Sequence, residues 1–190
     1  MGCDLDQNKK LPYLGRKEIN GNDTIYHTIA NFRFVNQDSN FVTKETFDGQ
    51  IYVADFFFTS CPTICPIMKT QMLRVYESYK DNGQVGILSH SIDPKHDTVA
   101  VLREFAGRLG VESKKWHFVT GDKEEIYKIG QTSYMVSAVE DPSEPGGFIH
   151  SGAFILVDKK RRIRGIYDGT KEDQVDRLMT DMDILLKEYE

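Results

Sequence analysis

The sequence lacks any long hydrophobic segment. In a chain of 190 residues, no apolar run approaches the roughly 20 residues that a membrane-spanning helix needs. No signal peptide can be recognised either. An excess of positive charge is also missing: the formal net charge is −5, which argues against a general nucleic-acid-binding protein. What is present, 39% hydrophobic and 28% charged residues, is an ordinary globular composition of a length that suits one domain with a sizeable core.

Cysteine is scarce, with three residues in the chain. Cys3 follows Gly2, and this pair fits the remnant of a lipoprotein cleavage site that leaves a lipid on Cys3; an accidental cysteine in a frayed terminus fits equally well. Residues 4–22 are polar and rich in Lys, Asn and Gly, a composition typical of a tether. We therefore predict a flexible N-terminal tether over 1–23, with Cys3 as a candidate lipid anchor, and a single domain over 24–190.

Hydrophobic periodicity and turn signals predict alternating strands and helices. Strands are expected at 27–35, 40–47, 51–58, 85–92, 116–119, 134–139, 150–157 and 162–167. Helices are expected at 68–79, 98–109, 123–130 and 172–189. Asp97 is the expected N-cap of the second helix, with Gly110 as its stop, and Thr170 or Asp168 is the expected cap of the last. The alternation in the middle of the chain favours parallel pairing, and the final hairpin makes the sheet mixed.

The other two cysteines lie in the stretch FFFTSCPTICPIM, residues 56–68. Cys61 and Cys65 follow a buried strand and precede a helix, at the sheet edge where α/β proteins bind ligands. A helix N-terminus lowers a thiol pKa, and Pro66 disfavours a helical Cys65. Four residues apart on a regular helix, side chains are separated by about 5–6 Å at Cβ, which suits a bridging metal better than a disulfide. A disulfide across an irregular turn stays open, and two purely structural cysteines are the less favoured alternative.

A soft metal held by two thiolates needs a further ligand, and histidine is the commonest. Of the five histidines, His27 and His96 are expected at the surface, His117 in packing, and His90 as a hydrogen-bonded core residue. His150 differs because it follows the loop DPSEPGG and opens a strand. Two cysteines and one histidine suit Cu(I), and Cu(II) could bind with an added water or carboxylate. A catalytic zinc with these three ligands and water is formally compatible.

With these residues in hand, the chain resembles the Sco/SenC family of copper proteins over roughly 28–187. The resemblance depends on several motifs in order: the aromatic strand DFFFT, the CPTICP box, the stretch SIDPKHDT, His150 before FILVD, and IYDGT. It implies a thioredoxin-like α/β fold, a mixed sheet flanked by helices with an added N-terminal β-hairpin. It also implies copper held by Cys61, Cys65 and His150, with Asp93 as the aspartate beside the site.

The resemblance further implies a membrane-tethered domain outside the cytoplasm, in the bacterial periplasm or cell envelope. Such a protein delivers copper to the copper-accepting subunit of cytochrome c oxidase, at its dinuclear copper site, and family members are also proposed to act as thiol reductants of that site's cysteines. Many relatives begin with a membrane helix, which this sequence does not contain; a lipid on Cys3 would replace it, or the sequence starts after such a helix.

The alternative is an enzyme, a thiol–disulfide oxidoreductase or thiol peroxidase that uses the Cys61/Cys65 pair. The pair is one residue wider than C-x-x-C, and His150 stands near the place where thioredoxins carry a cis-proline, with Pro145 several residues earlier. These departures favour a metallochaperone over an enzyme. Enzymatic activity stays open as an alternative, and so does a role as a redox or copper sensor. The basic cluster at 159–162 fits a solvated hairpin tip, with a docking patch for an acidic partner as the alternative.

Overall fold

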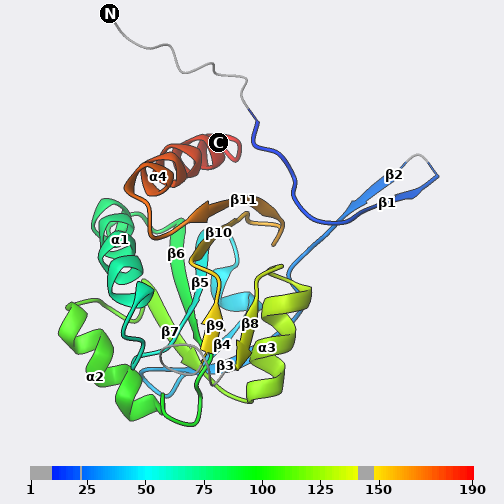
Figure 1. Ribbon diagram of the computed structural model, residues 1–190. Helices are drawn as coiled ribbons and strands as arrows, with labels where there is room; N and C mark the ends of the chain where they lie inside the picture. The colour runs from blue at the N-terminus through cyan, green and yellow to red at the C-terminus, as the bar shows by residue number, and fades with distance from the viewer. Residues whose placement is uncertain (1–9, 22, 141–147) are drawn as a thin grey trace, which may run out of the picture.

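The computed structural model describes residues 10–21, 23–140 and 148–190. Its central sheet has seven strands: β3 (Arg33–Asn36), β4 (Phe41–Thr43), β5 (Ile51–Phe57), β6 (Val85–Ser91), β7 (Trp116–Thr120), β10 (Ala153–Val157) and β11 (Ile163–Asp168). Their order is β11-β10-β5-β6-β7-β3-β4 (Figure 1). β5, β6 and β7 are parallel, and the remaining pairs are antiparallel. The predicted mixed sheet is therefore confirmed.

Helices cover both faces of this sheet. They are α1 (Ile64–Tyr79), α2 (Val99–Leu109), α3 (Lys123–Thr132) and α4 (Glu172–Lys187), with a short 3₁₀ helix η1 at Lys44–Phe47. α1, α2 and α4 lie on one face, and α3 lies on the other beside the ribbon of β8 (Ala138–Glu140) and β9 (Phe148–His150) (Figure 1). Successive side chains of a strand point to opposite faces, so Phe57 packs on Phe105 of α2, while a Cβ at Gly130 of α3 would come within 3.1 Å of Phe56.

The core explains why these segments fold as they do. Every residue of β5 and of β6 is buried, as expected for strands covered on both faces. The predicted apolar stripe of α1 is confirmed, since Met68, Met72, Val75 and Tyr79 are all buried. α2 ends as predicted, because Gly110 adopts φ +68° and its N–H bonds back to the last turn.

The expected start of α1 and the expected N-caps of α2 and α4 were wrong. α1 begins at Ile64 rather than 68, so Cys65 is helical; Pro66 falls in the first turn, where a missing N–H costs nothing. The N-cap of α2 is Thr98, whose hydroxyl accepts from Val101 N, because the Asp97 carboxylate is buried and used elsewhere. The N-cap of α4 is Lys171, without a side-chain cap.

The strands also differ from expectation in detail. The hairpin expected over 27–35 and 40–47 narrows to β3 and β4, because residues 44–47 form η1. The strand expected over 134–139 is reduced to β8. The strand expected over 150–157 is divided: His150 ends β9, and β10 starts at Ala153 after Gly152, whose carbonyl accepts from Gly169 N at 2.6 Å.

The segment predicted as a tether contains structure at its end. β1 (Lys17–Asn20) and β2 (Asp23–Tyr26) form an antiparallel ribbon that projects from the body (Figure 1). Leu11 is buried, and Leu14 N donates to Ile163 O, so residues 11–14 run along β11. The flexible tether and the domain boundary at 24 stay predictions.

Candidate metal centre

The two cysteines lie where β5 ends and α1 begins, as the sequence predicts. Cys61 N donates to Phe58 O at 3.3 Å, which closes a turn directly after the strand, and Cys65 occupies the first turn of α1. Both side chains are buried, at 7% and 4% exposure. Cys61 Sγ lies 3.7 Å from Thr63 Oγ1. Both cysteines are in the thiol form rather than bonded to each other.

A cavity of about 220 Å³ opens beside the thiols. Its lining is mostly apolar, and it includes both cysteines, Phe58, Leu73, Phe105 and Lys69. A larger cavity of about 450 Å³ lies between residues 30–34 and α3, and its lining contains neither cysteine. Of these two cavities, the smaller is the one that borders the sulfur-bearing residues.

Lys69, one turn beyond Cys65, belongs to a buried polar network. Its Nζ donates to Asp55 Oδ2 at 2.6 Å and to Ser89 Oγ at 3.2 Å, and Ser89 Oγ in turn donates to Asp55. Trp116 Nε1 donates to Ser89 Oγ at 2.8 Å, and the Lys69 ammonium lies 4.1 Å from the centroid of the Phe57 ring. A lone buried charge would be very costly, so this network is what allows a cation so close to the thiols.

The environment of the thiols favours their protonated form. A hydrogen bond with the Cys61 thiol, followed by burial, raises the pKa of the Cys65 thiol well above its ordinary range, although the Lys69 charge acts in the opposite direction. The expectation that the helix N-terminus lowers this pKa was therefore wrong, because burial and the thiol–thiol contact outweigh the helix dipole. A cation that displaces both protons would reverse this balance.

The loop after β5 is held by Asp97. This fully buried carboxylate accepts from Thr59 N at 3.0 Å, from the Thr59 hydroxyl and from Ser91 Oγ at 2.6 Å. Thr59 stands two residues before Cys61, so Asp97 positions the loop that carries the thiols. The sequence did not predict this role for Asp97. An aspartate directly before a helix is expected to be its N-cap, and nothing local indicates a contact with Thr59.

Asp93, the candidate neighbour of the metal, is half-buried. Its carbonyl accepts from Asp97 N at 2.8 Å, and its carboxylate lies 3.4 Å from His96 N. These contacts organise the turn before α2. A role for Asp93 next to copper stays a prediction.

The segment that carries His150 lies beside the start of α1. β9 pairs with β8 so that His150 faces Ala138, and Ser151 N donates to Ser137 O at 3.1 Å. Two residues beyond His150, a Cβ at Gly152 would come within 3.7 Å of Ile64 Cδ1, the side chain just before Cys65. The Ser151 hydroxyl is buried and has no hydrogen-bond partner in the described part of the chain. The backbone thus brings this segment to the cysteine-bearing turn, while the His150 side chain lies outside the described residues.

The other four histidines have separate roles. His27 contacts Ser133 O through Nε2 at 2.7 Å, His96 is exposed, and His117 packs on Phe47 and contacts Asn36. His90 is fully buried, as predicted, but its ring nitrogens make no well-formed hydrogen bond within the described residues. Within the part of the chain whose side chains are described, which leaves out His150, none of these four joins a cluster of metal-binding side chains.

Some predicted features lie outside the described residues. Cys3, the candidate lipid anchor, is one, and the loop DPSEPGG at 141–147 is another. No helix in the described part of the chain has the length and apolar character needed to cross a bilayer.

Two buried thiols at a strand-to-helix junction of a helix-covered mixed sheet define a thioredoxin-like protein with a dithiol site. Residues 21–186 match the sequence profile of the SCO1/SenC family. The chain is 32% identical over 162 residues to a SCO1 protein homolog of Bacillus subtilis, which covers 84% of this chain and 83% of the relative. The chain belongs to the SCO1/SenC family.

Solved structures agree with this assignment. A SCO1/SenC family lipoprotein from Bacillus anthracis superposes with a TM-score of 0.76 at 28% identity, over 84% of this chain and 95% of the other. BsSco, described as a member of the Sco family of cytochrome c oxidase assembly proteins with a disulfide switch, gives 0.73 at 31% identity, over 84% and 93%. ScoI of Arabidopsis thaliana with copper bound gives 0.67 at 25% identity, over 84% and 97%. The expected thioredoxin-like fold is confirmed.

Proposed function

We propose that this chain binds one copper ion through Cys61, Cys65 and His150 and delivers it to the copper-accepting subunit of cytochrome c oxidase. The observation that carries the proposal is the pair of buried thiols at the start of α1, with Gly152, two residues after His150, beside Ile64 of the same turn. Copper-bound ScoI of Arabidopsis thaliana and the assembly role of BsSco support it.

Copper is the cargo in this proposal, so the site must bind it and also release it. Two thiolates and an imidazole are soft ligands that suit Cu(I), and three ligands leave room for an incoming ligand of the acceptor. Loading displaces the thiol protons, because only the thiolate binds metal. The cavity beside both cysteines offers the path by which an acceptor side chain reaches the metal.

The location proposed for the chain is the outer side of a membrane, with a lipid on Cys3 as the anchor. The Bacillus anthracis relative is a lipoprotein. Thiols that bind or exchange copper outside the cytoplasm also meet an oxidising environment, so a thiol reductant is a necessary partner for this site.

The ligand set is tested by titrating reduced protein with Cu(I) against a chromogenic chelator, for wild type, Cys61→Ser, Cys65→Ser and His150→Ala. Loss of a direct ligand should weaken binding at least as much as the roughly 100-fold that outer-shell changes can cause. His96→Ala is the matched control, because His96 is exposed, and it should bind as wild type does. Unchanged affinity in His150→Ala would remove His150 from the site.

The same titration has a predictable pH dependence. The raised pKa of Cys65 means that its proton is still bound at neutral pH. If both thiols release a proton on loading, apparent Cu(I) affinity should fall by about 100-fold for each unit of pH decrease. A flat profile between pH 6 and 8 would show that the thiols are not the ligands.

A second function, thiol–disulfide exchange, is favoured by the hydrogen bond between the two thiols and by the disulfide switch of BsSco. Oxidation to a Cys61–Cys65 disulfide would release two electrons and two protons to a partner disulfide. The reduction potential of this pair, measured against glutathione, together with insulin-reductase turnover, distinguishes an oxidoreductase from a copper carrier.

A further inference from the structure

A buried cation borders the two thiols. Lys69 is only 4% exposed, and it follows Cys65 by one turn of α1, a spacing at which side chains on a helix are neighbours. It also lines the cavity beside both cysteines, and within the described part of the chain it is the one charged residue that does so. Buried lysines are rare unless they are paired, so the position of this charge next to two metal-binding residues points to a role at the site.

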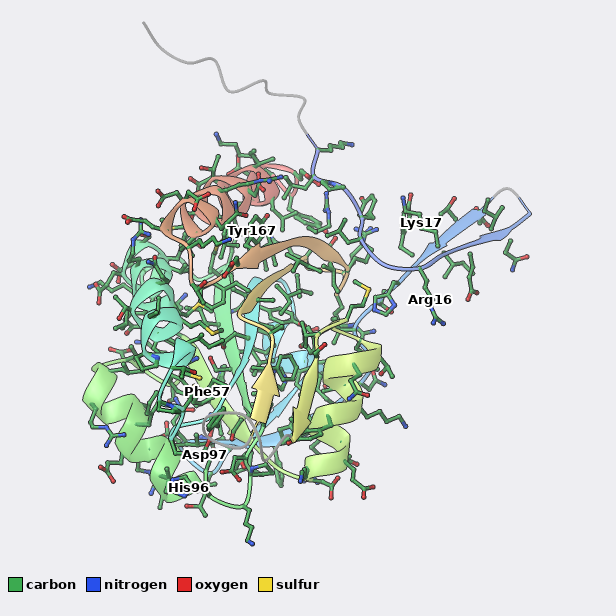
Figure 2. All side chains as sticks on the ribbon, viewed as in Figure 1. Arg16, Lys17, Phe57, His96, Asp97 and Tyr167 are labelled. Carbon is green, nitrogen blue, oxygen red and sulfur yellow. The ribbon has the colours of Figure 1, made fainter. Side chains whose placement is uncertain are left out.

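The Lys69 ammonium is held by groups that do not line the cavity. Its Nζ donates to Asp55 Oδ2 at 2.6 Å and to Ser89 Oγ at 3.2 Å, and both acceptors are fully buried. The centroid of the Phe57 ring lies 4.1 Å from Nζ, and Figure 2 shows Phe57 on the side of the sheet that α1 and α2 cover. Lys69 and Asp55 therefore form a fixed dipole, and its positive residue is the one that borders the thiols.

The positive charge of Lys69 acts on the thiol pair. Contact with Cys61 and burial raise the pKa of the Cys65 thiol, and the Lys69 charge opposes that rise. The Asp97 carboxylate accepts from the backbone and the hydroxyl of Thr59, and it does not line the cavity. Lys69 is therefore the charge that the fold places against the sulfur atoms.

Net charge distinguishes the two oxidation states of copper at a dithiolate site. Two thiolates and a neutral third ligand carry one net negative charge with Cu(I) and none with Cu(II). Charges interact strongly where water is excluded, so a nearby ammonium stabilises the Cu(I) complex more than the Cu(II) complex. Reduction of the bound ion adds one electron and no proton while both thiolates stay bound, so this difference in charge is what the ammonium acts on.

We propose that Lys69 determines the oxidation state of the cargo by selecting Cu(I) over Cu(II). The inference rests on the proposed binding of copper by Cys61 and Cys65, and it does not depend on His150, because an imidazole ligand is neutral. Lys69 acts through its charge rather than as a ligand. Since Asp55 and Ser89 already hold the ammonium in place, it needs no rearrangement when the copper changes its oxidation state.

The test measures the reduction potential of the bound copper by spectroelectrochemistry, with redox mediators as electron donors, and the Cu(I) and Cu(II) affinities by competition with chelators. Lys69→Met should lower the ratio of Cu(I) to Cu(II) affinity about tenfold, which is a fall of about 59 mV for one electron. Lys69→Arg keeps the charge, because a guanidinium stays protonated, and its ratio should stay within about threefold of wild type. The control Lys128→Met removes an exposed lysine from α3, on the opposite face of the sheet, and should match wild type (Figure 1).

A second variant separates charge from stability. Asp55→Val/Lys69→Met removes the whole buried pair and should fold more stably than Lys69→Met, yet its affinity ratio should still fall, by less than in the single variant. An unchanged ratio in both variants, or equal losses in Lys69→Met and Lys69→Arg, would overturn the inference and leave Lys69 a structural residue. Wild type that binds copper with such a result contradicts this inference alone, whereas wild type that binds neither ion contradicts the proposed function as well.

Discussion

Buried polar groups have different surroundings on the two faces of the β5–β6 pair. Toward α1 and α2, Asp55 and Ser89 form a network with Lys69 in which every polar group has a partner. Toward α3, the His90 ring stacks on Phe56 with centroids 4.6 Å apart and meets Phe34 and Tyr134 edge-on. Burial lowers the pKa of His90 to about 3, although the Asp55 backbone acts in the opposite direction.

This difference shows how the interior accepts a polar residue. A charge persists on the α1 face because its counter-ion and hydrogen bonds are buried with it, whereas the α3 face accepts only a neutral imidazole. The charged network lies next to the thiols, so the site is built on the face where a charge can be stabilised. The two faces therefore predict different responses to mutation and to pH.

Removing the cation should have the largest effect. Lys69→Met leaves the fully buried Asp55 with Ser89 as its remaining side-chain partner, and breaking a buried pair in this way costs about 3–5 kcal/mol. Urea denaturation monitored by circular dichroism measures the loss. Asp55→Val/Lys69→Met removes both charges and should recover much of the stability; a double variant as unstable as the single one would contradict the importance of the charge pair.

Lowering the pH should destabilise the protein through His90, on the face toward α3. His90 is neutral when folded, while its unfolded pKa is about 6.5, so the unfolded chain binds the extra proton and stability falls as pH drops below about 6.5. With the folded pKa at about 3, this residue accounts for roughly 2.5 kcal/mol of lost stability at pH 4.5. His90→Phe should remove that part of the pH dependence, and exposed His96→Gln should not. Denaturation curves from pH 4 to 8 that coincide in shape for wild type and His90→Phe would refute the assignment.

A third buried group tests whether a carboxylate needs a cation. Within the described residues, the Asp97 carboxylate accepts from neutral donors, those of Thr59 and Ser91. Asp97→Asn places an amide against one of these donors, and we expect a loss of about 1–3 kcal/mol, smaller than for Lys69→Met. Thr98→Ala controls for the adjacent cap. A weakened Cu(I) affinity in Asp97→Asn alone would show that the Thr59 contact positions Cys61.

Features that depend on residues close together in the sequence were predicted, whereas features that depend on contacts between distant residues were not. The α1 stripe, the Gly110 stop and the position of the cysteines depend on local pattern, and all were predicted correctly. The β1–β2 ribbon was missed, although Asn20-Gly21 is a hairpin signal, because its strands are short and polar. Thr98 displaced Asp97 as the cap because Asp97 bonds to a loop 38 residues earlier.

The buried charges beside the thiols could not be predicted from the sequence, because they too depend on contacts between distant residues. Lys69 and Asp55 meet only after α1 packs on the sheet, and nothing local marks either residue as a partner. The loop before it and the resemblance to a family both marked His150 as a candidate ligand, and the fold adds that Gly152, two residues further on, lies beside Ile64. Tertiary contacts, rather than periodicity, thus decide which polar residues surround the thiols.

The most direct test of the copper site is X-ray absorption spectroscopy at the copper edge of the Cu(I)-loaded chain. We predict two sulfur ligands and one nitrogen ligand for each copper, with the nitrogen lost in His150→Ala and retained in His96→Ala. Sulfur-only coordination in wild type, or a nitrogen that persists in His150→Ala, would contradict it.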